Sequence, residues 1–225
     1  MPRQVDLRPE CPPVYNQKHL NSCSANAIGA AIWFDWRRHD PRSPSPSRLF
    51  IYYNERASED CISINGTVQL RDGYRSVARE GVCPERLWPY KVERYRRKPS
   101  APCYEAAIEH RAIWFGRIEQ SLRHLKACLA EGYPFTAAVA VYRSFESRDV
   151  RKTGLVPLPH HGDPHIGGHA MLVVGYSDAG EHFIVRNSWG SSWGDNGYCF
   201  FPYEYMLKPE HAWDFWTVRR VTRSR

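Results

Sequence analysis

Residues 17–27 read QKHLNSCSANA, a polar segment with one cysteine that leads into an apolar helical pattern. With Asn21 or Ser22 as the N-cap, the spacing predicts a helix from Ser22 to about Arg38. Its apolar face is formed by Ala25, Ile28, Ile32 and Trp36. Unpaired amides and the positive end of the helix dipole favour a thiolate in the first turn, so Cys23 is a candidate nucleophile.

A thiol that attacks a carbonyl needs three further groups, and the chain offers a candidate for each. His169 follows two glycines and heads an apolar run, so it is the candidate base. Asn187, in the segment NSWG at 187–190, is the candidate group that orients the imidazole, and Gln17 is the candidate donor to the oxyanion. Taken singly, Cys23, His169 and Asn187 would each have an ordinary structural role, as a buried cysteine, a core histidine and a turn asparagine. Their occurrence together favours a catalytic role over these structural roles and indicates a thiol hydrolase.

Three blocks resemble the active-site segments of papain-family cysteine peptidases in order and spacing, namely residues 17–27, GHAMLVVGY at 168–176 and VRNSWGSSWG at 185–194. The resemblance extends from Val5 to about Tyr205. It implies a helical left lobe, a right lobe built on a β-barrel, and an active-site cleft between them.

The resemblance also implies a role for each candidate. Gln17 and the backbone amide of Cys23 hold the oxyanion, while Asn187 orients His169 and Trp189 covers that bond from water. We expect Cys23 and His169 to form an ion pair whose thiolate attacks a peptide carbonyl. A thioester then forms and is hydrolysed by water.

Asn65-Gly66-Thr67 stands where the family usually has Asn-Gly-Gly, a backbone strip that pairs with extended substrate. Thr67 departs from that pattern, and its bulk and restricted backbone alter the second substrate pocket. Gly168 and Trp189 complete the expected substrate-binding set. Ser24 and Asn21 are further departures, because the family commonly has Trp and Gly at those positions.

The remaining pattern predicts an α+β protein with helices first and strands later. Further helices are expected at Ser47–Ala57, at Thr67–Glu80 and near Gln120–Glu131. Strands are expected at Phe135–Val141, His169–Tyr176, His182–Asn187, Tyr198–Phe201 and Phe215–Val221. We expect one domain over 1–225, with a helical lobe at about 10–110, a β-rich lobe at about 111–207 and a C-terminal segment at 208–225 that packs back on the body.

Composition narrows the class of protein. The chain has 225 residues, of which 42% are hydrophobic and 24% charged, as in a folded globular protein. A net charge of +7 without a nucleic-acid-binding motif indicates a solvated surface and no nucleic-acid partner. The charged first twenty residues and the lack of a run of about 18 apolar residues predict a soluble chain with no export signal and no membrane association. Localisation stays open between the cytoplasm and a secreted or trimmed mature form.

The sequence predicts no cofactor and no metal, because the cluster of His160, His161 and His165 lies in a Gly- and Pro-containing loop without zinc-site spacing. Seven cysteines fit one free nucleophile with up to three disulfides, or none in a reducing compartment. The resemblance suggests a Cys61–Cys103 disulfide. It leaves no room for the usual propeptide before Val5, so we expect either a trimmed precursor or control by a proteinaceous inhibitor or a separate pro-segment.

The leading hypothesis is a monomeric cysteine endopeptidase that acts on peptide or protein substrates. A second hypothesis is an acyl-transfer enzyme on the same site, such as a ligase, transglutaminase or deamidase. A third is a catalytically silent protein that binds peptides in the cleft, although the intact catalytic residues count against it.

Overall fold

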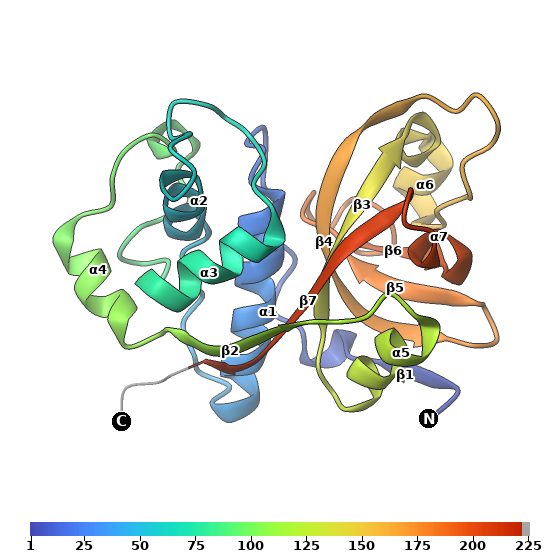
Figure 1. The fold of residues 1–225 in the computed structure, drawn as a ribbon, viewed down its shortest axis with the longest axis horizontal. Coiled ribbons are helices and arrows are strands. Elements are labelled where there is room, and N and C mark those ends of the chain that lie inside the picture. The colour runs from blue at the N-terminus through green and yellow to red at the C-terminus, as the bar shows by residue number, and fades with distance from the viewer. Residues whose placement is uncertain (222–225) are drawn as a thin grey trace.

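A computed structural model describes residues 1–221 of the chain, apart from the side chains of 112, 113, 220 and 221. Four helices come first, and most of the sheet follows (Figure 1). The helices are α1 (Cys23–His39), α2 (Arg48–Ala57), α3 (Leu70–Glu80) and α4 (Ala101–Ile108). Three further helices accompany the sheet, namely α5 (Leu122–Ala130), α6 (Arg148–Thr153) and α7 (Tyr203–Leu207).

The sheet has the strand order β2-β7-β3-β4-β5-β6, and β1 pairs with β4 outside that path. All pairings between the described strands are antiparallel. The strands are β1 (Gln4–Asp6), β2 (Ala112–Arg117), β3 (Phe135–Tyr142), β4 (His165–Ser177), β5 (His182–Arg186), β6 (Tyr198–Pro202) and β7 (Ala212–Val221). The α+β class predicted from the sequence is confirmed.

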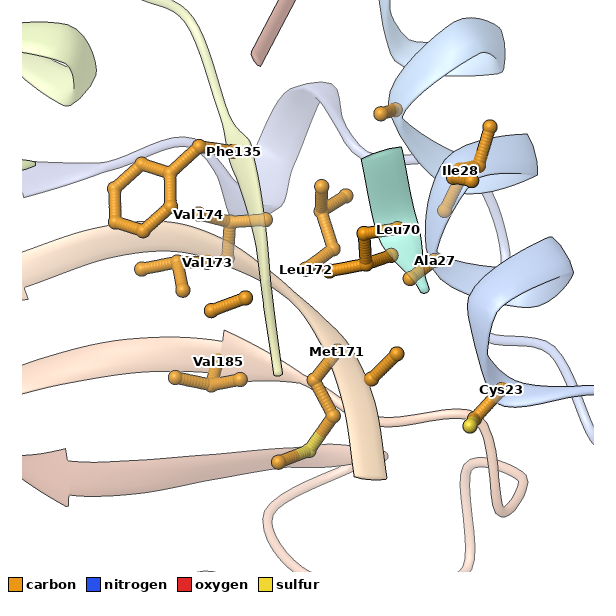
Figure 2. Close-up of a cluster of buried hydrophobic side chains, with 14 of the residues drawn as sticks. Cys23, Ala27, Ile28, Leu70, Phe135, Met171, Leu172, Val173, Val174 and Val185 are labelled. Atoms are coloured by element: carbon orange, nitrogen blue, oxygen red, sulfur yellow. The ribbon is translucent and has the colours of Figure 1, made fainter. Parts of the chain in front are cut away.

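Helix α1 joins the helices to the sheet. It is buried almost all round, since its alanines and Gly29 let neighbouring elements approach closely, and it packs against α2, α3, β4 and β7. Figure 2 shows Ala27 of α1 and Leu70 of α3 beside Leu172 of β4, with Cys23 at the end of this core. The nucleophile candidate therefore lies where the helical part meets the sheet.

The N-terminal segment ties the two parts together. Strand β1 pairs with β4, and the amide of Leu7 donates to the carbonyl of Val174 at 2.9 Å. Further along, the guanidinium of Arg186 donates to the carbonyls of Pro12 and Pro13. These bonds bring the segment before Cys23 alongside the end of β5.

The predicted helices and strands are all found, with shifted ends. Helix α3 begins at Leu70, three residues later than predicted, because residues 67–69 form part of the cleft wall. Strand β4 begins at His165 and β7 at Ala212, both earlier than predicted. The residues 222–225 of the predicted C-terminal segment lie outside the described residues. Helix α4 is not among the predicted helices, and it carries Pro102 in its first turn, where proline is tolerated.

The suggested Cys61–Cys103 disulfide is wrong, since all seven cysteines are free. Cys103, on α4, contacts the hydroxyl of Ser100 at 3.3 Å and the thiol of Cys83. Cys61 instead donates its S–H to the carbonyl of Arg56 at 3.5 Å. The helix that carries Cys103 turns its sulfur toward a different cysteine.

Within residues 1–221, no group of three His, Cys, Asp or Glu side chains is placed to hold a metal ion. None of the described helices combines the length and apolar character needed to cross a membrane.

Candidate active site

Cys23 is the first residue of α1 and borders a cleft. Its side chain is 4% exposed, yet it lines two adjoining pockets. The preceding residue is held firmly: the carbonyl of Ser22 accepts from the amide of Asn26 at 3.0 Å, and its hydroxyl contacts that of Tyr90 at 2.6 Å. N–H groups in the first helical turn have no acceptor within the helix, so the amide of Cys23 is a donor available to an oxyanion.

His169 lies on β4, opposite Val139 of β3. Pairing of β4 with β5 begins only at Leu172, so the other edge of β4 is open at His169. Asn187 directly follows β5 and occupies that opening, with its Oδ1 at 2.8 Å from the Nε2 of His169. The sheet register thus brings together two residues that are 18 positions apart.

The hydrogen bonds around Asn187 fix the tautomer of His169. The backbone amide of Ser188 also donates to Asn187 Oδ1, at 2.8 Å. Because a backbone N–H can only donate, this atom is the carbonyl oxygen, and His169 Nε2 must carry the hydrogen. The other ring nitrogen, Nδ1, then keeps its lone pair and can accept a proton.

Trp189 covers this arrangement. Its ring lies 5.1 Å from that of His169 between centroids, at 31°. Trp189 in turn packs edge-on against Phe145 and Trp193. A covered histidine–asparagine bond is screened less by water, which strengthens the orientation of the imidazole.

Gln17 is joined to the same loop. Its backbone amide donates to the carbonyl of Ser188 at 2.8 Å, and the Ser188 hydroxyl donates to Gln17 Oε1 at 2.6 Å. Its Nε2 donates one hydrogen to the carbonyl of Leu20 at 2.9 Å. An amide has two such hydrogens, and Gln17 lines a pocket with Cys23 and His169, so the second hydrogen is available there.

Burial affects the two reacting groups in opposite directions. It raises the pKa of the Cys23 thiol to about 11, an effect that a hydrogen bond from the Ala170 backbone opposes and the charge of Glu55 reinforces. It lowers the pKa of His169 to about 4, partly offset by the bond to Asn187. Burial therefore favours the neutral thiol and imidazole. The ion pair expected from the sequence would form only if the attraction between the Cys23 thiolate and the His169 imidazolium outweighed burial. That attraction is not among the causes of either pKa shift.

Two pockets flank the candidate nucleophile and share Cys23, Thr67, Gly168 and His169. The first has a volume of about 340 Å³ and extends past Thr67 toward Trp213 of β7. The second has a volume of about 360 Å³ and contains Gln17 and Trp189. An extended peptide that crosses both would pass directly over Cys23.

The predicted substrate-binding residues divide into two groups. Thr67 and Gly168 line both pockets, and Trp189 lines the second. Asn65 and Gly66 line neither of these two pockets. Asn65 instead fixes the loop before the nucleophile, since its Oδ1 accepts from the amide of Asn21 at 2.9 Å and its carbonyl accepts from Asn21 Nδ2 at 2.7 Å.

Sequence reasoning missed several residues of this site. Ser188 belongs to the segment NSWG, but its contact with Gln17, 171 positions away, leaves no signal in the sequence. Arg117 and Asp214 line the first pocket from β2 and β7, and nothing in their local sequence marks them. Glu55 lies buried behind Cys23, where its Oε1 accepts from the hydroxyl of Ser24 at 2.7 Å.

The chain is similar to known proteins over most of its length. A family model described as papain family cysteine protease matches residues 1–206. An uncharacterised peptidase C1-like protein of Acanthamoeba polyphaga mimivirus is 38% identical over 229 residues, which covers 98% of this chain and 74% of the viral protein. A cathepsin B-like protein of Giardia intestinalis is 26% identical over 192 residues, covering 82% of this chain and 50% of that protein. The chain thus spans about half the length of the Giardia relative.

Solved structures show the same fold. Xylellain, a cysteine protease from Xylella fastidiosa, has a TM-score of 0.90 and 41% sequence identity, with 100% of this chain and 87% of that chain covered. A cysteine protease of Carica candamarcensis, crystallised in complex with E-64, has a TM-score of 0.68 and 20% identity, with both chains covered completely at 100%. At that identity the second likeness concerns the fold alone.

Proposed function

This chain belongs to the papain family of cysteine proteases, and from that membership we propose that it is an endopeptidase that cleaves peptide bonds through Cys23, His169 and Asn187. The observation that carries the proposal is the 2.8 Å bond between His169 Nε2 and Asn187 Oδ1. It leaves Nδ1 as the proton acceptor on a residue that shares both cleft pockets with Cys23.

The first half of the reaction forms a thioester. His169 Nδ1 takes the proton of the Cys23 thiol, and the sulfur attacks the peptide carbonyl. The amide of Cys23 and the second hydrogen of Gln17 Nε2 donate to the resulting oxyanion. Protonated His169 then gives its proton to the leaving amine, and the C–N bond breaks.

The second half releases the acid. Water enters the place of the leaving amine and loses a proton to His169 as it attacks the thioester carbonyl. The same two donors hold the second oxyanion. The C–S bond breaks, and the thiolate recovers the proton from His169, which restores the starting state.

The test uses the whole chain, a fluorogenic peptide library and the inhibitor E-64. We expect cleavage of at least one peptide, one covalent E-64 adduct on Cys23 by mass spectrometry, and neither in Cys23→Ala. Cys199→Ala is the matched control, because Cys199 is a buried thiol that lines neither pocket next to Cys23. Labelling of Cys23 without hydrolysis, together with transfer to an added amine, would replace the endopeptidase proposal with acyl transfer. If the folded protein forms no E-64 adduct on Cys23, both the endopeptidase proposal and the acyl-transfer alternative are wrong.

A further inference from the structure

The first pocket beside Cys23 is lined by apolar residues and by two oppositely charged ones. The apolar residues are Val68, Leu70, Ala138, Ala170 and Trp213. The lining also includes one cation, Arg117 of β2, and one anion, Asp214 of β7. Which substrate side chain this pocket prefers depends on which of these two charged groups lacks a partner within the protein.

The carboxylate of Asp214 is already engaged. Its Oδ2 accepts from the backbone amide of Leu70 at 3.0 Å, and its Oδ1 accepts from the indole N–H of Trp216. Leu70 is the first residue of α3, whose N-cap Gln69 makes no side-chain capping bond, so Asp214 supplies the cap from the opposite wall. Both oxygens are directed toward the protein.

Arg117 is in the opposite situation. Its side chain is exposed, and within the described residues it has neither an ion pair nor a hydrogen bond, even though Asp214 lines the same pocket. The amide of Gln69 and the hydroxyl of Thr67 line the pocket as well. The lining of the pocket thus includes unused donors, whereas each oxygen of its one acid already accepts a hydrogen bond from the protein.

We propose that this pocket selects substrates with an acidic side chain, glutamate above all, and that Arg117 is the residue that determines this specificity. A planar guanidinium binds a carboxylate through two parallel hydrogen bonds. The two methylenes of glutamate would pack on the exposed ring of Trp213 while its carboxylate reaches Arg117. The inference rests on the proposed peptidase function, because it assigns a preference to that same cleft.

The test uses a peptide series in which only one residue changes, between Glu, Gln, Lys and Leu, placed in turn at each of the three positions before the scissile bond. Glutamine has the shape of glutamate without its charge, so the Glu/Gln ratio of kcat/KM isolates the effect of Arg117. We expect a ratio of about two to five in the wild type at one of these positions, the range for an exposed charged pair. The ratio should fall as salt rises, since the pair is screened.

Substitutions then identify the residue. Arg117→Gln should bring the Glu/Gln ratio to about one, because kcat/KM falls more for the Glu peptide than for the Gln and Leu peptides, while Arg117→Glu should favour the Lys peptide. Arg123→Gln is the control, because Arg123 is an exposed residue of α5 that lines neither pocket. An unchanged Glu/Gln ratio in Arg117→Gln, with the Leu peptide still cleaved, overturns the inference alone. Failure of the wild type to cleave any peptide overturns the proposed function and this inference with it.

Discussion

The hydroxyl of Ser188 donates to Gln17 Oε1 at 2.6 Å, across 171 positions of sequence. Together with the bond from Gln17 Nε2 to the carbonyl of Leu20, it fixes both ends of the glutamine amide. A donor that is already oriented stabilises an oxyanion without reorganisation during the reaction. Ser188 is therefore a positioning residue that acts through Gln17.

Ser188→Ala should lower kcat by about three- to tenfold with little change in KM, because the oxyanion contact exists only once the carbonyl has been attacked. Gln17→Ala should lose about a hundredfold to a thousandfold. If Ser188 acts only through Gln17, the double variant is no slower than Gln17→Ala. If the loss of kcat in the double variant equals the product of the two single losses, Ser188 does not act through Gln17. Ser191→Ala, at an exposed serine of the same loop, should have wild-type kinetics.

The pH profile of peptide cleavage should reflect one proton shared between Cys23 and His169. The pKa of His169 is lowered to about 4 and that of Cys23 raised to about 11, so between these values the pair keeps a single proton. Below about pH 4 the imidazole is protonated while the sulfur is still a thiol, and attack stops. We expect a broad plateau in kcat/KM with its acid limb near pH 4.

Asn187→Ala should lower kcat/KM by about tenfold to a thousandfold, because His169 loses the bond that sets its tautomer and orientation. That bond also raises the pKa of His169, so its removal should move the acid limb to lower pH. A shift of the limb separates this role from a general loss of structure, which would lower the rate at every pH. An acid limb that moves upward would show that Asn187 does not act through His169.

The fold class and the four proposed catalytic residues could be predicted because each leaves a local pattern in the sequence. The apolar period of α1 places Cys23 in a first helical turn, and the run after His169 predicts β4. Residues of this kind are recognised from their immediate neighbours. Their roles in catalysis remain predictions until the kinetics are measured.

The rest of the cleft could not be predicted, because its contacts join residues that are distant in sequence. Asp214 caps α3 from 144 positions away, and Arg117 reaches the pocket only because β2 pairs with β7. The partner of Cys103 depends on the rotation of α4, which the sequence pattern does not determine. Such contacts follow from the packing of the two parts of the chain.

Glu55 should make stability depend on pH. It is buried behind Cys23, and its Oε2 has no hydrogen-bond partner among the described residues. Burial raises its pKa from 4.5 to about 8, opposed by the Ser24 bond and the charge of Arg56 and reinforced by Glu59. Between these two pH values the unfolded chain ionises while the folded protein keeps its proton. Folding stability attributable to Glu55 is therefore highest below pH 4.5, falls up to about pH 8 and is then constant.

Glu55→Gln should remove this dependence while its carbonyl oxygen still accepts from Ser24. We expect the stability of the variant relative to wild type to rise by a few kcal/mol, in order of magnitude, between pH 4.5 and 8. Urea unfolding at a series of pH values measures it. Glu105→Gln, at an exposed site on α4, should differ from wild type in its free energy of unfolding by the same amount at every pH. If the difference in unfolding free energy between Glu55→Gln and wild type is also independent of pH, Glu55 ionises normally in the folded protein.

Asp214 should contribute to stability by joining the two walls of the cleft. Its Oδ2 accepts from the amide of Leu70 at the start of α3, and its backbone adopts φ 57°, a left-handed conformation that Asp and Asn tolerate better than most residues. Asp214→Ala removes the cap and adds backbone strain, so we expect a loss of about 1–2 kcal/mol in urea unfolding. Asp214→Asn keeps an acceptor oxygen and the tolerated backbone, and should lose less than half as much. If both variants lose the same amount, the bond to Leu70 does not stabilise α3.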